Sequence, residues 1–479
     1  MNIDAQIDAL FQPLSSAVFS VLFYSVPILG QDVKLLLVWL VGSGVFFSLY
    51  LGFINIRCFG HAIAIVRGKY DSGKNQDGQI SSFQALMTSM AATVGLGNIA
   101  GVAVAISTGG PGAALWMAVI AAFGMSVKFA EVMCGVKYRH HPDPDNPREI
   151  YGGPMYYLRD VFKRKNMPYI GTFVAGLFAF FCMTGALGGS CLFQTNQAFQ
   201  QLLNVTGGDA SWFADKGWAF GIFMVLISGV VIVGGIKSIA NVSSKIVPFM
   251  GGIYVIMGLV VLIMDIGNVP QALAEIFKSA FVPEAGMGAI LGTFLIGVQR
   301  AAFSNEAGLG SAAVSQASVR TSSPVAQGLV GMLGPFIDTI VICMVTATVI
   351  VLTGAYQGGV GVEGVELTSR AFGSVVSWFP YLLAVIVFLF AYSTIIGWYY
   401  IGARGFTYLF GEHAWVENIY KVIYCVFIVI GGAASLSNVI DFTDAMLLSM
   451  AIPNIIGLYM LAPEIKRDVK EYLAGLKQT

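Results

Sequence analysis

Charged residues are scarce in this sequence. Only 11% of its 479 residues are Asp, Glu, Lys or Arg, whereas 56% are hydrophobic; soluble globular proteins carry about a quarter charged residues. Acidic and basic residues balance to a net charge of zero, and the cations lie in separate loops, so the chain has no continuous basic face that would favour nucleic acid. These shortages exclude an ordinary soluble protein and predict a membrane protein.

Metal-binding, disulfide and catalytic patterns are also missing. Six cysteines are scattered through or beside apolar stretches without C-x-x-C spacing, so we expect them to pack as small hydrophobic residues. His61, His140, His141 and His413 fall outside the apolar segments, which argues against haem, zinc or a histidine proton relay. No zinc-protease, serine-hydrolase or phosphate-loop motif occurs, so the sequence predicts neither an enzyme nor a cofactor.

The N-terminal stretch MNIDAQIDALFQPLSS contains two acids and no base. A secretory signal peptide would begin with a positively charged region, so we expect this stretch to belong to the mature protein. The apolar piece at 15–29 is short and is interrupted near Pro27 and Gly30. We expect it to be interfacial or re-entrant.

Long apolar runs dominate what is present. A helix needs about 20 apolar residues to cross the core of a bilayer. Eleven segments meet this length: 33–55, 82–107, 112–136, 171–203, 218–236, 246–266, 287–313, 326–353, 376–402, 417–435 and 444–462. The sequence therefore predicts an all-α membrane protein with about eleven transmembrane helices.

Positive charges predict the side of the membrane on which each loop lies, because cytoplasmic loops accumulate Lys and Arg. With the N-terminus outside, most cations fall in inner loops. The outer loops keep only Lys34, Lys216, Lys278 and Arg370. We therefore predict a multi-pass protein of the plasma or inner membrane with its C-terminus in the cytoplasm. The Pro-rich loop at 138–170 would lie on the cytoplasmic surface and hold a short helix.

Two Gly-rich stretches interrupt the apolar segments. The first, 91-AATVGLGNIAG-101, and the second, 303-FSNEAGLGSAA-313, share the triplet G-L-G. Each is followed by four more segments, so the ten segments after the first one divide into two groups of five. Because five is odd, the second group must cross the membrane in the opposite orientation. The pattern predicts a 5+5 inverted repeat with a broken first helix in each half.

The glycines make a break in each helix inexpensive, since Gly destabilises a helix interior by about 1 kcal/mol relative to Ala. Freed N–H groups at the start of a half-helix attract a carboxylate, and freed carbonyls can coordinate Na⁺. The pair of breaks predicts a site for an amino-acid zwitterion and a small cation, although one such cluster alone would also suit close helix packing. Residues 95–100 also match the letters of a dinucleotide-binding loop. Such a loop follows a β-strand and has an acid about 20 residues later, whereas these residues lie in an apolar helical segment and the next acid is Glu131. A dinucleotide site is therefore excluded.

Ionisable residues inside apolar segments are costly and mark candidate functional groups. Arg300, Glu306 and Asp338 lie in such segments. Arg300 and Asp338 fall at similar predicted depths, so they could form a gate near the second break or a buried pair that only fixes helix packing. Lys128 and Glu131, one turn apart, are expected to pair locally or to reach the interface.

Neutral polar side chains gather in two further segments. One is the run from Gln194 to Gln197, and the other is 390-FAYSTIIGWYY-400, in which Ser393 and Thr394 follow Phe390 by one helical turn. Two hydroxyls and a carbonyl could supply three oxygens to Na⁺. Alternatively, the hydroxyls bond back to the preceding turn of their own helix.

Four blocks closely resemble the alanine or glycine:cation symporter family, the sodium:alanine symporters. They are QISSFQALMTSMAATVGLGNIAGVAVAISTGGPGAALWMAVIAAFGMSVKFAEV, AAFSNEAGLGSAA, GPFIDTIVIC and FAYSTIIGWYYIGARGFTYLFG, in this order. The resemblance implies eleven transmembrane helices, a core of the leucine-transporter type with two inverted five-helix repeats, and Na⁺-driven uptake of alanine and glycine.

The stretch MAATVGLGN also resembles the broken first helix of sodium-coupled neurotransmitter transporters. By position, this similarity implies substrate-carboxylate contacts at Leu96 and Gly97, with Thr93 and Asn98 facing the substrate or a second cation. The family resemblance adds Gln194 as a polar substrate contact. It also implies that the second break consists of Phe303, Ser304 and Asn305. The implied sodium ligands are the carbonyls of Ala91 and Val94 and oxygens of Phe390, Ser393 and Thr394.

We therefore expect a secondary active transporter that moves alanine or glycine with Na⁺ by alternating access, in a lipid bilayer and without an obligate protein partner. The alternative is a proton-coupled amino-acid symporter that uses Glu306 or Asp338. The expected parts are an N-terminal segment with one extra helix and a cytoplasmic loop, two repeats and a cytoplasmic tail, at 1–80, 81–266, 267–463 and 464–479. The sequence leaves open alanine versus glycine, L versus D isomers and the number of Na⁺ ions.

Overall fold

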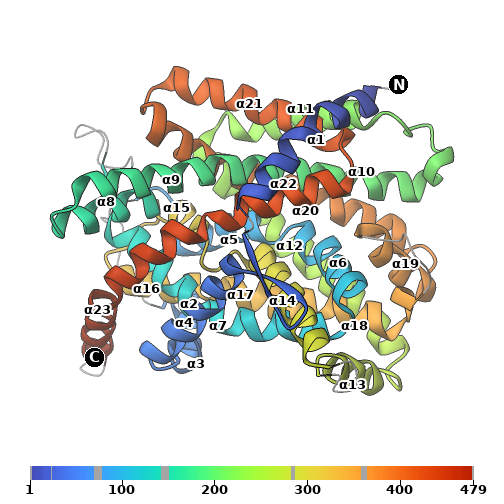
Figure 1. Ribbon diagram of the computed structural model, residues 1–479, viewed down its shortest axis with the longest axis horizontal. Coiled ribbons are helices and arrows are strands. Elements are labelled where there is room, and N and C mark those ends of the chain that lie inside the picture. The colour runs from blue at the N-terminus through green and yellow to red at the C-terminus, as the bar shows by residue number, and fades with distance from the viewer. Residues whose placement is uncertain are drawn as a thin grey trace.

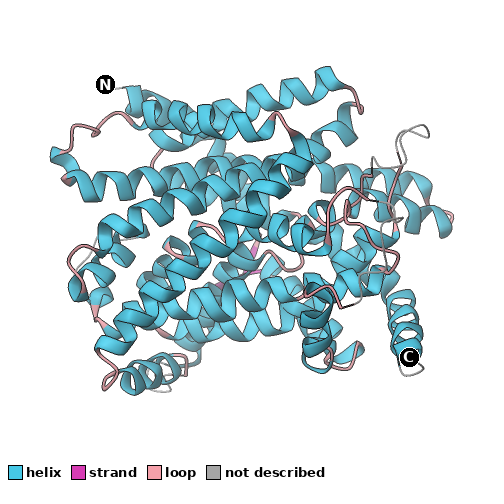
Figure 2. Ribbon diagram, turned by 180° about the vertical axis from the view of Figure 1, so that it is seen from behind, coloured by secondary structure: helices cyan, strands magenta, loops and turns pink. Residues whose placement is uncertain are grey.

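A computed structural model describes residues 3–22, 24–69, 78–141, 150–281, 286–357 and 364–476 of the chain. Helices make up most of this part (Figure 2). The one sheet within these ranges is an antiparallel hairpin of β1 (Ser25–Ile28) and β2 (Gln31–Lys34). Helices suit a bilayer because each bonds its backbone polar groups within its own segment. The predicted all-α class is confirmed.

The N-terminal elements lie outside the two groups of five segments. They are α1 (Ile3–Leu22), the hairpin, α2 (Leu35–Tyr50), α3 (Ile54–Arg57) and α4 (Phe59–Val66). In α1, the Asp4 carboxylate accepts the Gly217 N–H (2.9 Å) and the Asp8 carboxylate accepts the Ser435 N–H (2.8 Å). Carboxylates stabilise helix starts in this way, so α1 is fixed along the bundle (Figure 1). The piece predicted at 15–29 is not one element, because α1 and β1 divide it.

The first group of five segments forms five helical runs. They are α5 (Ser82–Thr93) with η1 (Leu96–Asn98) and α6 (Ala100–Gly109); α7 (Gly112–Lys137); α9 (Pro168–Ala186) with η2 (Leu187–Leu192) and α10 (Phe193–Thr206); α11 (Gly217–Ile232); and α12 (Gly235–Met264). Two short helices stand between these runs, α8 (Pro154–Arg164) and η3 (Gly208–Ala210). The short helix expected in the loop at 138–170 is α8.

The second group also forms five helical runs, and the first of them is interrupted, as in the first group. Its runs are α14 (Gly286–Asn305) with α15 (Ser311–Ser315); α16 (Pro324–Gly331) with α17 (Leu333–Pro335), η5 (Phe336–Cys343) and α18 (Met344–Leu352); α20 (Phe379–Phe410); α21 (Ala414–Ala433); and α22 (Leu436–Ser449) with α23 (Ala451–Leu476). Shorter elements between the runs are α13 (Val269–Ser279), η6 (Ala355–Gln357) and α19 (Val365–Val375).

Each of the eleven predicted segments coincides with a helical run. Within the described ranges, eight runs are long and apolar enough to cross a membrane, and the bent pair of α5 with η1 and α6 makes nine. The remaining two, α2 and α11, are apolar but have only 16 residues each. The helices are therefore confirmed in place, and eleven crossings stay a prediction.

Loops and segment ends that are predicted to share one side of the membrane contact one another. On the side predicted to be inner, the Arg320 N–H donates to the Ile80 carbonyl (2.8 Å). On the other side, the Gln197 side chain accepts the Val365 N–H (2.9 Å). Figure 1 places α8 and the C-terminus at one end of the molecule and α19 and the N-terminus at the other. The alternation of the loops thus agrees with the topology, while the side that faces the cytoplasm stays a prediction.

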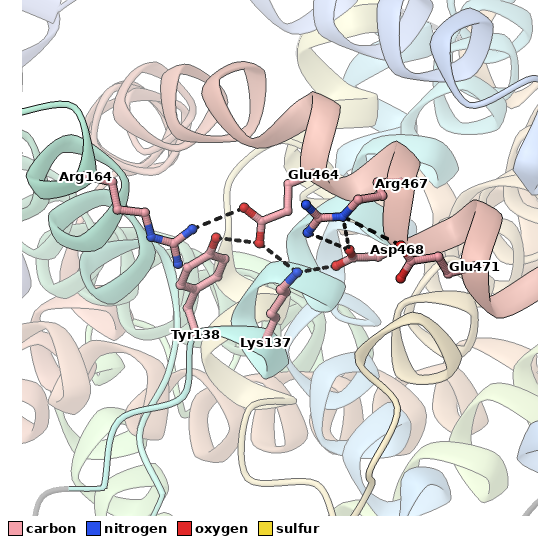
Figure 3. Close-up of polar contacts among 7 residues, drawn as sticks. All are labelled: Lys137, Tyr138, Arg164, Glu464, Arg467, Asp468 and Glu471. Carbon is pink, nitrogen blue, oxygen red and sulfur yellow. Dashed lines mark hydrogen bonds and ion pairs between the residues drawn. The ribbon is translucent and has the colours of Figure 1, made fainter.

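An ion-pair network joins α7 and α8 to the C-terminal half of α23 (Figure 3). Lys137 contacts both Glu464 (2.6 Å) and Asp468, and Arg164 pairs with Glu464 (3.2 Å). The Tyr138 hydroxyl donates to Glu464 (2.8 Å), and burial, then this carboxylate, raise the pKa of Tyr138 so that the hydroxyl keeps its proton. Single partly exposed pairs contribute little, but this network links three elements at the end predicted to be cytoplasmic.

Glycines allow α11 and α21 to approach each other closely. A methyl group on Gly432 of α21 would overlap the Gly217 carbonyl oxygen of α11, and one on Gly217 would overlap the Gly432 carbonyl. Small residues at such crossings let helix backbones approach each other in membranes.

We predict that Gly432→Ala lowers the stability of the purified protein by about 1–3 kcal/mol, because overpacking forces the two helices apart. The measurement is thermal unfolding in detergent. Gly252→Ala is the control, since no atom lies within 4 Å of an added methyl group there. Equal unfolding temperatures for the two variants would contradict the close crossing.

Candidate functional site

The first helix break lies where the glycines predict it. α5 ends at Thr93, α6 begins at Ala100, and the two helices are bent by 61°. The Gly95 N–H donates to the Asn98 side-chain oxygen (3.0 Å), and the Leu96 N–H donates to Oε1 of Gln194 (2.9 Å). These N–H groups are thereby turned away from the last carbonyls of α5, and the helical ladder is interrupted.

Glycine is required at position 95 by its neighbours. A methyl group there would lie 2.5 Å from Oγ1 of Thr394 and 3.0 Å from Oε1 of Gln194. Both polar side chains therefore reach the backbone of the break directly. Gln194 is held in this position by its amide, which donates to the Gly189 carbonyl within the π-helical turn η2 (3.0 Å).

The second break begins later than predicted. Phe303, Ser304 and Asn305 form the last turn of α14, and the break covers 306–310. The backbone leaves the helix at Glu306, whose φ is +56°, and Gly308 and Gly310 also have positive φ. Glycine adopts such angles without strain, so the break extends from Glu306 through the two glycines and lies after the residues predicted to form it.

Buried polar side chains satisfy the backbone of the second break. The Lys128 ammonium donates to the carbonyls of Asn305 (3.0 Å) and Glu306 (3.2 Å). The Glu131 carboxylate accepts the Gly310 N–H (3.0 Å), and the Asn454 amide donates to the Gly308 carbonyl (2.8 Å) and to Glu131 (2.8 Å). Every freed group named here thus has a protein partner.

The local pairing or interfacial position predicted for Lys128 and Glu131 is therefore wrong. Their exposed fractions are 1% and 0%, and each binds the backbone of another helix. The cause is the need of a broken helix for polar partners at membrane depth. The sequence signal was present, since both charges stand in an apolar segment, but one-turn spacing suggested a mutual pair.

The structure brings the two breaks together. A methyl group on Gly97 would lie 3.2 Å from the Phe303 ring, and the Asn98 amide lies 3.5 Å from the Ser304 hydroxyl. The Phe303 ring also packs edge-on against Phe193 (5.0 Å between centroids). Five of the predicted substrate residues thus surround one point between α6, α10 and α14: Leu96, Gly97, Gln194, Phe303 and Ser304.

The other three predicted substrate residues are placed differently. Thr93 is the last residue of α5. Asn98 is fully buried, and its amide donates to Asp338, including the Asp338 carbonyl (3.0 Å). Asn305 is turned toward η5, where its amide donates to the Thr339 hydroxyl (3.1 Å). The amides of Asn98 and Asn305 are therefore engaged with protein groups in this conformation.

Asp338 does not pair with Arg300, so that predicted pair is wrong. The Asp338 carboxylate contacts the amide of Asn98 and the hydroxyl of Ser304 (3.3 Å). It lies in the π-helical turn η5, which carries it to the two breaks. No Lys, Arg or His of the described ranges lies within ion-pair distance of this fully buried carboxylate.

Arg300 pairs with Asp444 of α22 instead. Gln299 donates to the same carboxylate (2.6 Å), and the Lys34 ammonium at the end of the hairpin donates to Gln299 (2.9 Å). The Arg300 guanidinium also lies 5.4 Å from the centre of the Phe303 ring. The sequence does not mark Asp444 as a buried charge, because it is the first residue of the predicted segment 444–462. In the structure α22 begins at Leu436, so Asp444 lies within a helix.

Two elements that carry predicted sodium ligands, α5 and α20, pack against each other. A methyl group on Gly397 of α20 would lie 3.3 Å from the carbonyl carbon of Ala91. The Thr394 hydroxyl is buried beside Gly95 and has no hydrogen-bond partner within the described ranges. The Ser393 hydroxyl donates to the Phe390 carbonyl (3.0 Å), which is the backbone bonding that the sequence left open. Ala91 and Thr394 therefore lie where α20 packs on α5 and the first break, and Val94 is the residue that follows α5. The joint binding of an ion by these residues with Phe390 and Ser393 stays a prediction.

Trp398 links the two breaks and was not singled out in the sequence. Its indole N–H donates to the Ala92 carbonyl (3.2 Å), one of the carbonyls freed at the end of α5, and to the Glu306 carboxylate (2.9 Å). Glu306 also accepts the Ser311 hydroxyl. A single side chain from α20 therefore contacts the first break and the second.

Comparison with known proteins gives similarity over nearly the whole chain. The family model described as the sodium:alanine symporter family matches residues 20–479. The sodium/alanine symporter AgcS of Methanococcus maripaludis is 40% identical over 91% of this chain and 94% of its own. The amino-acid carrier protein AlsT of Bacillus subtilis is 35% identical over 93% and 90%, and the probable sodium/glutamine symporter GlnT of the same organism is 34% identical over 92% and 88%.

A solved structure shares the fold. It is the crystal structure of MhsT in complex with L-phenylalanine, with a TM-score of 0.54, which covers 81% of this chain and 89% of that chain at 16% identity. At this identity the likeness concerns the fold alone. It agrees with the predicted core of the leucine-transporter type.

We predict that Arg300→Met and Asp444→Leu each lower stability by about 3–5 kcal/mol, because each leaves a buried charge without its partner. The double variant should be less destabilised than either single variant. Unfolding of the purified protein by heat or denaturant provides the measurement. Arg370→Met is the control, since its ion pair with Glu366 (3.9 Å) is exposed and should contribute about 0–1 kcal/mol. Strictly additive losses in the double variant would contradict the pairing.

Proposed function

The chain belongs to the sodium:alanine symporter family, and we propose that it carries a small neutral amino acid, alanine or glycine, into the cell together with Na⁺. It is a membrane transporter and not an enzyme. Two helix breaks meet, and beside the first lies the buried Thr394 hydroxyl, which has no hydrogen-bond partner among the described residues; this observation supports the proposal most directly.

In the proposed mechanism, Na⁺ binds between the end of α5 and α20. Its ligands are the carbonyls of Ala91 and Val94 together with oxygens of Phe390, Ser393 and Thr394. A Na⁺ ion would give the Thr394 hydroxyl a partner, which it lacks among the described residues, and buried polar groups without partners are costly. Since these ligands are neutral oxygens, they suit a monovalent hard cation.

The amino-acid carboxylate binds at the N–H groups of Leu96 and Gly97. The Leu96 N–H is at present held by a neutral acceptor, Gln194, and a carboxylate is a stronger acceptor than an amide. The substrate can therefore take over this N–H while the freed Gln194 side chain contacts the substrate itself. The Phe303 ring, which packs edge-on against Phe193, lies beside Gly97 and would contact the side chain of the bound amino acid.

Na⁺ and substrate are coupled because both act on the first break. Ordering α5 against α20 fixes the N–H groups that the substrate needs, so each ligand raises the affinity for the other. Trp398 extends this coupling to the second break through Ala92 and Glu306. Access then alternates by movement of one set of helices against the other, with the N-terminus outside and the C-terminus in the cytoplasm.

The relatives' names include both alanine and glutamine as transported amino acids, so the family alone does not fix the substrate. A methyl group in a tight pocket changes selectivity by about 1–3 kcal/mol. Competition of labelled alanine uptake by glycine, by D- and L-alanine and by glutamine would rank these substrates.

A proton-coupled symporter is the second candidate, because the buried Asp338 carboxylate has no cation beside it within the described ranges. In that case uptake would follow a pH gradient without Na⁺, and Asp338→Asn would abolish the pH-driven component. Glu306 is the other acid that could carry the proton.

We predict concentrative uptake of labelled alanine into proteoliposomes when a Na⁺ gradient is imposed. Replacing Na⁺ by K⁺ on both sides should reduce uptake to the level of empty liposomes, since Na⁺ is the ion that the proposed mechanism couples to the substrate. Equal uptake with K⁺ and Na⁺ would exclude sodium coupling. Uptake by empty vesicles and by vesicles carrying an unrelated membrane protein provides the baseline.

We predict that Thr394→Val raises the Na⁺ concentration for half-maximal uptake by about tenfold, corresponding to roughly 1.4 kcal/mol for one lost hydroxyl contact. Thr394→Ser keeps the oxygen and should behave as the parent protein. Thr348→Val is the matched control, because its hydroxyl only bonds the Met344 carbonyl of its own helix (2.7 Å). An unchanged Na⁺ dependence in Thr394→Val would remove this residue from the proposed site.

A further inference from the structure

A groove with a volume of about 770 Å³ lies between the end of α2, α3 and the C-terminal half of α23. Apolar side chains, among them Leu51, Val469 and Leu473, form part of its lining. Three cations also line it, Arg57, Lys466 and Lys470, and none of its described lining residues is acidic. The groove is therefore apolar within and positive at its edge.

No carboxylate of the described residues neutralises the three cations. Within the described ranges, none of them lies within 4 Å of an Asp or Glu oxygen. The Lys466 ammonium lies 4.2 Å from the centre of the Tyr50 ring, and Arg57 donates to the Gly52 carbonyl (3.2 Å). Lys466 and Lys470 stand one helical turn apart and so share one face of α23.

Each acid of α23 is engaged by a cation outside the groove. Figure 3 shows Glu464 and Asp468 directed to Lys137 of α7, with Glu464 also bound by Arg164. Glu471 pairs with Arg467 (3.9 Å). Glu464 and Asp468 thus face α7 and α8, Glu471 is paired on the exposed surface, and Lys466 and Lys470 line the groove.

Exposed apolar side chains continue outward from the groove. Leu49 at its edge has an exposed fraction of 61%, and Ile56 of the neighbouring α3 has 71%. In a membrane protein such side chains face lipid tails. A ligand in this place therefore meets positive charge at one end and a lipid-facing apolar surface at the other.

We propose that this groove binds one anionic phospholipid of the surrounding bilayer. Its phosphate lies among Arg57, Lys466 and Lys470, and an acyl chain runs over Leu51, Val469 and Leu473 to the surface at Leu49 and Ile56. Basic pockets beside membrane helices on the cytoplasmic side recognise anionic headgroups in this way, and the groove lies at the end of the molecule predicted to be cytoplasmic. The proposal does not depend on the transported amino acid or the coupling ion.

The test is native mass spectrometry of the purified protein with equal amounts of phosphatidylglycerol and phosphatidylcholine. The parent protein should retain phosphatidylglycerol preferentially, with each cation contributing about fivefold. The groove variant, Arg57→Gln with Lys466→Gln and Lys470→Gln, should lose this preference. The matched control removes three exposed cations at the same end, Lys163→Gln with Lys165→Gln and Lys245→Gln, and should keep it.

Equal losses in the groove variant and the control would show a general effect of surface charge and would overturn the proposal. Displacement of the lipid by millimolar glycerol phosphate would also overturn it, since the site would then select a soluble phosphate ester. Monodispersity and unfolding temperature report whether each variant is folded. If the triple variant does not fold, Lys466→Gln with Lys470→Gln gives the same reading, because both side chains are exposed.

Discussion

Backbone groups that leave a helix inside a bilayer must find polar partners within the protein, and this constraint organises the centre of the molecule. The first break is bonded by Gln194, and the second by Lys128, Glu131 and Asn454. These partners come from three different helices, α10, α7 and α23. The broken helices therefore draw the surrounding ones into a single polar centre in an otherwise apolar protein.

The same constraint connects structure with transport. A break whose N–H groups are held by neutral side chains can exchange them for a charged ligand at little cost, because a carboxylate is the stronger acceptor. Trp398 bonds both breaks at once, so a ligand that reshapes one affects the other. Two ion pairs join further helices of the protein, Arg300 of α14 with Asp444 of α22 and Lys137 of α7 with Glu464 of α23.

Local sequence signals predicted the breaks but not the partners of the buried charges. The triplet at 95–97 breaks the first helix at the place predicted, whereas the second break starts after Asn305 because the positive φ angles belong to Glu306 and the glycines that follow. The prediction that Arg300 and Asp338 are buried is confirmed. Arg300, however, binds Asp444 of α22, and Asp338 binds Asn98 of η1. Depth along a helix follows from counting residues, but direction around it depends on turns such as η5.

The sequence by itself determined the all-helical membrane class, the place of each apolar helix and the existence of two matched breaks. It could do so because hydrophobicity and the backbone cost of glycine act within a few residues. Only the tertiary structure decided that Thr394 meets Gly95, that Lys128 and Glu131 serve the second break, and that Arg300 pairs with Asp444. These contacts join segments far apart in the chain. Their geometry depends on how the helices pack, because buried polar groups are stabilised by hydrogen-bond partners that other helices supply.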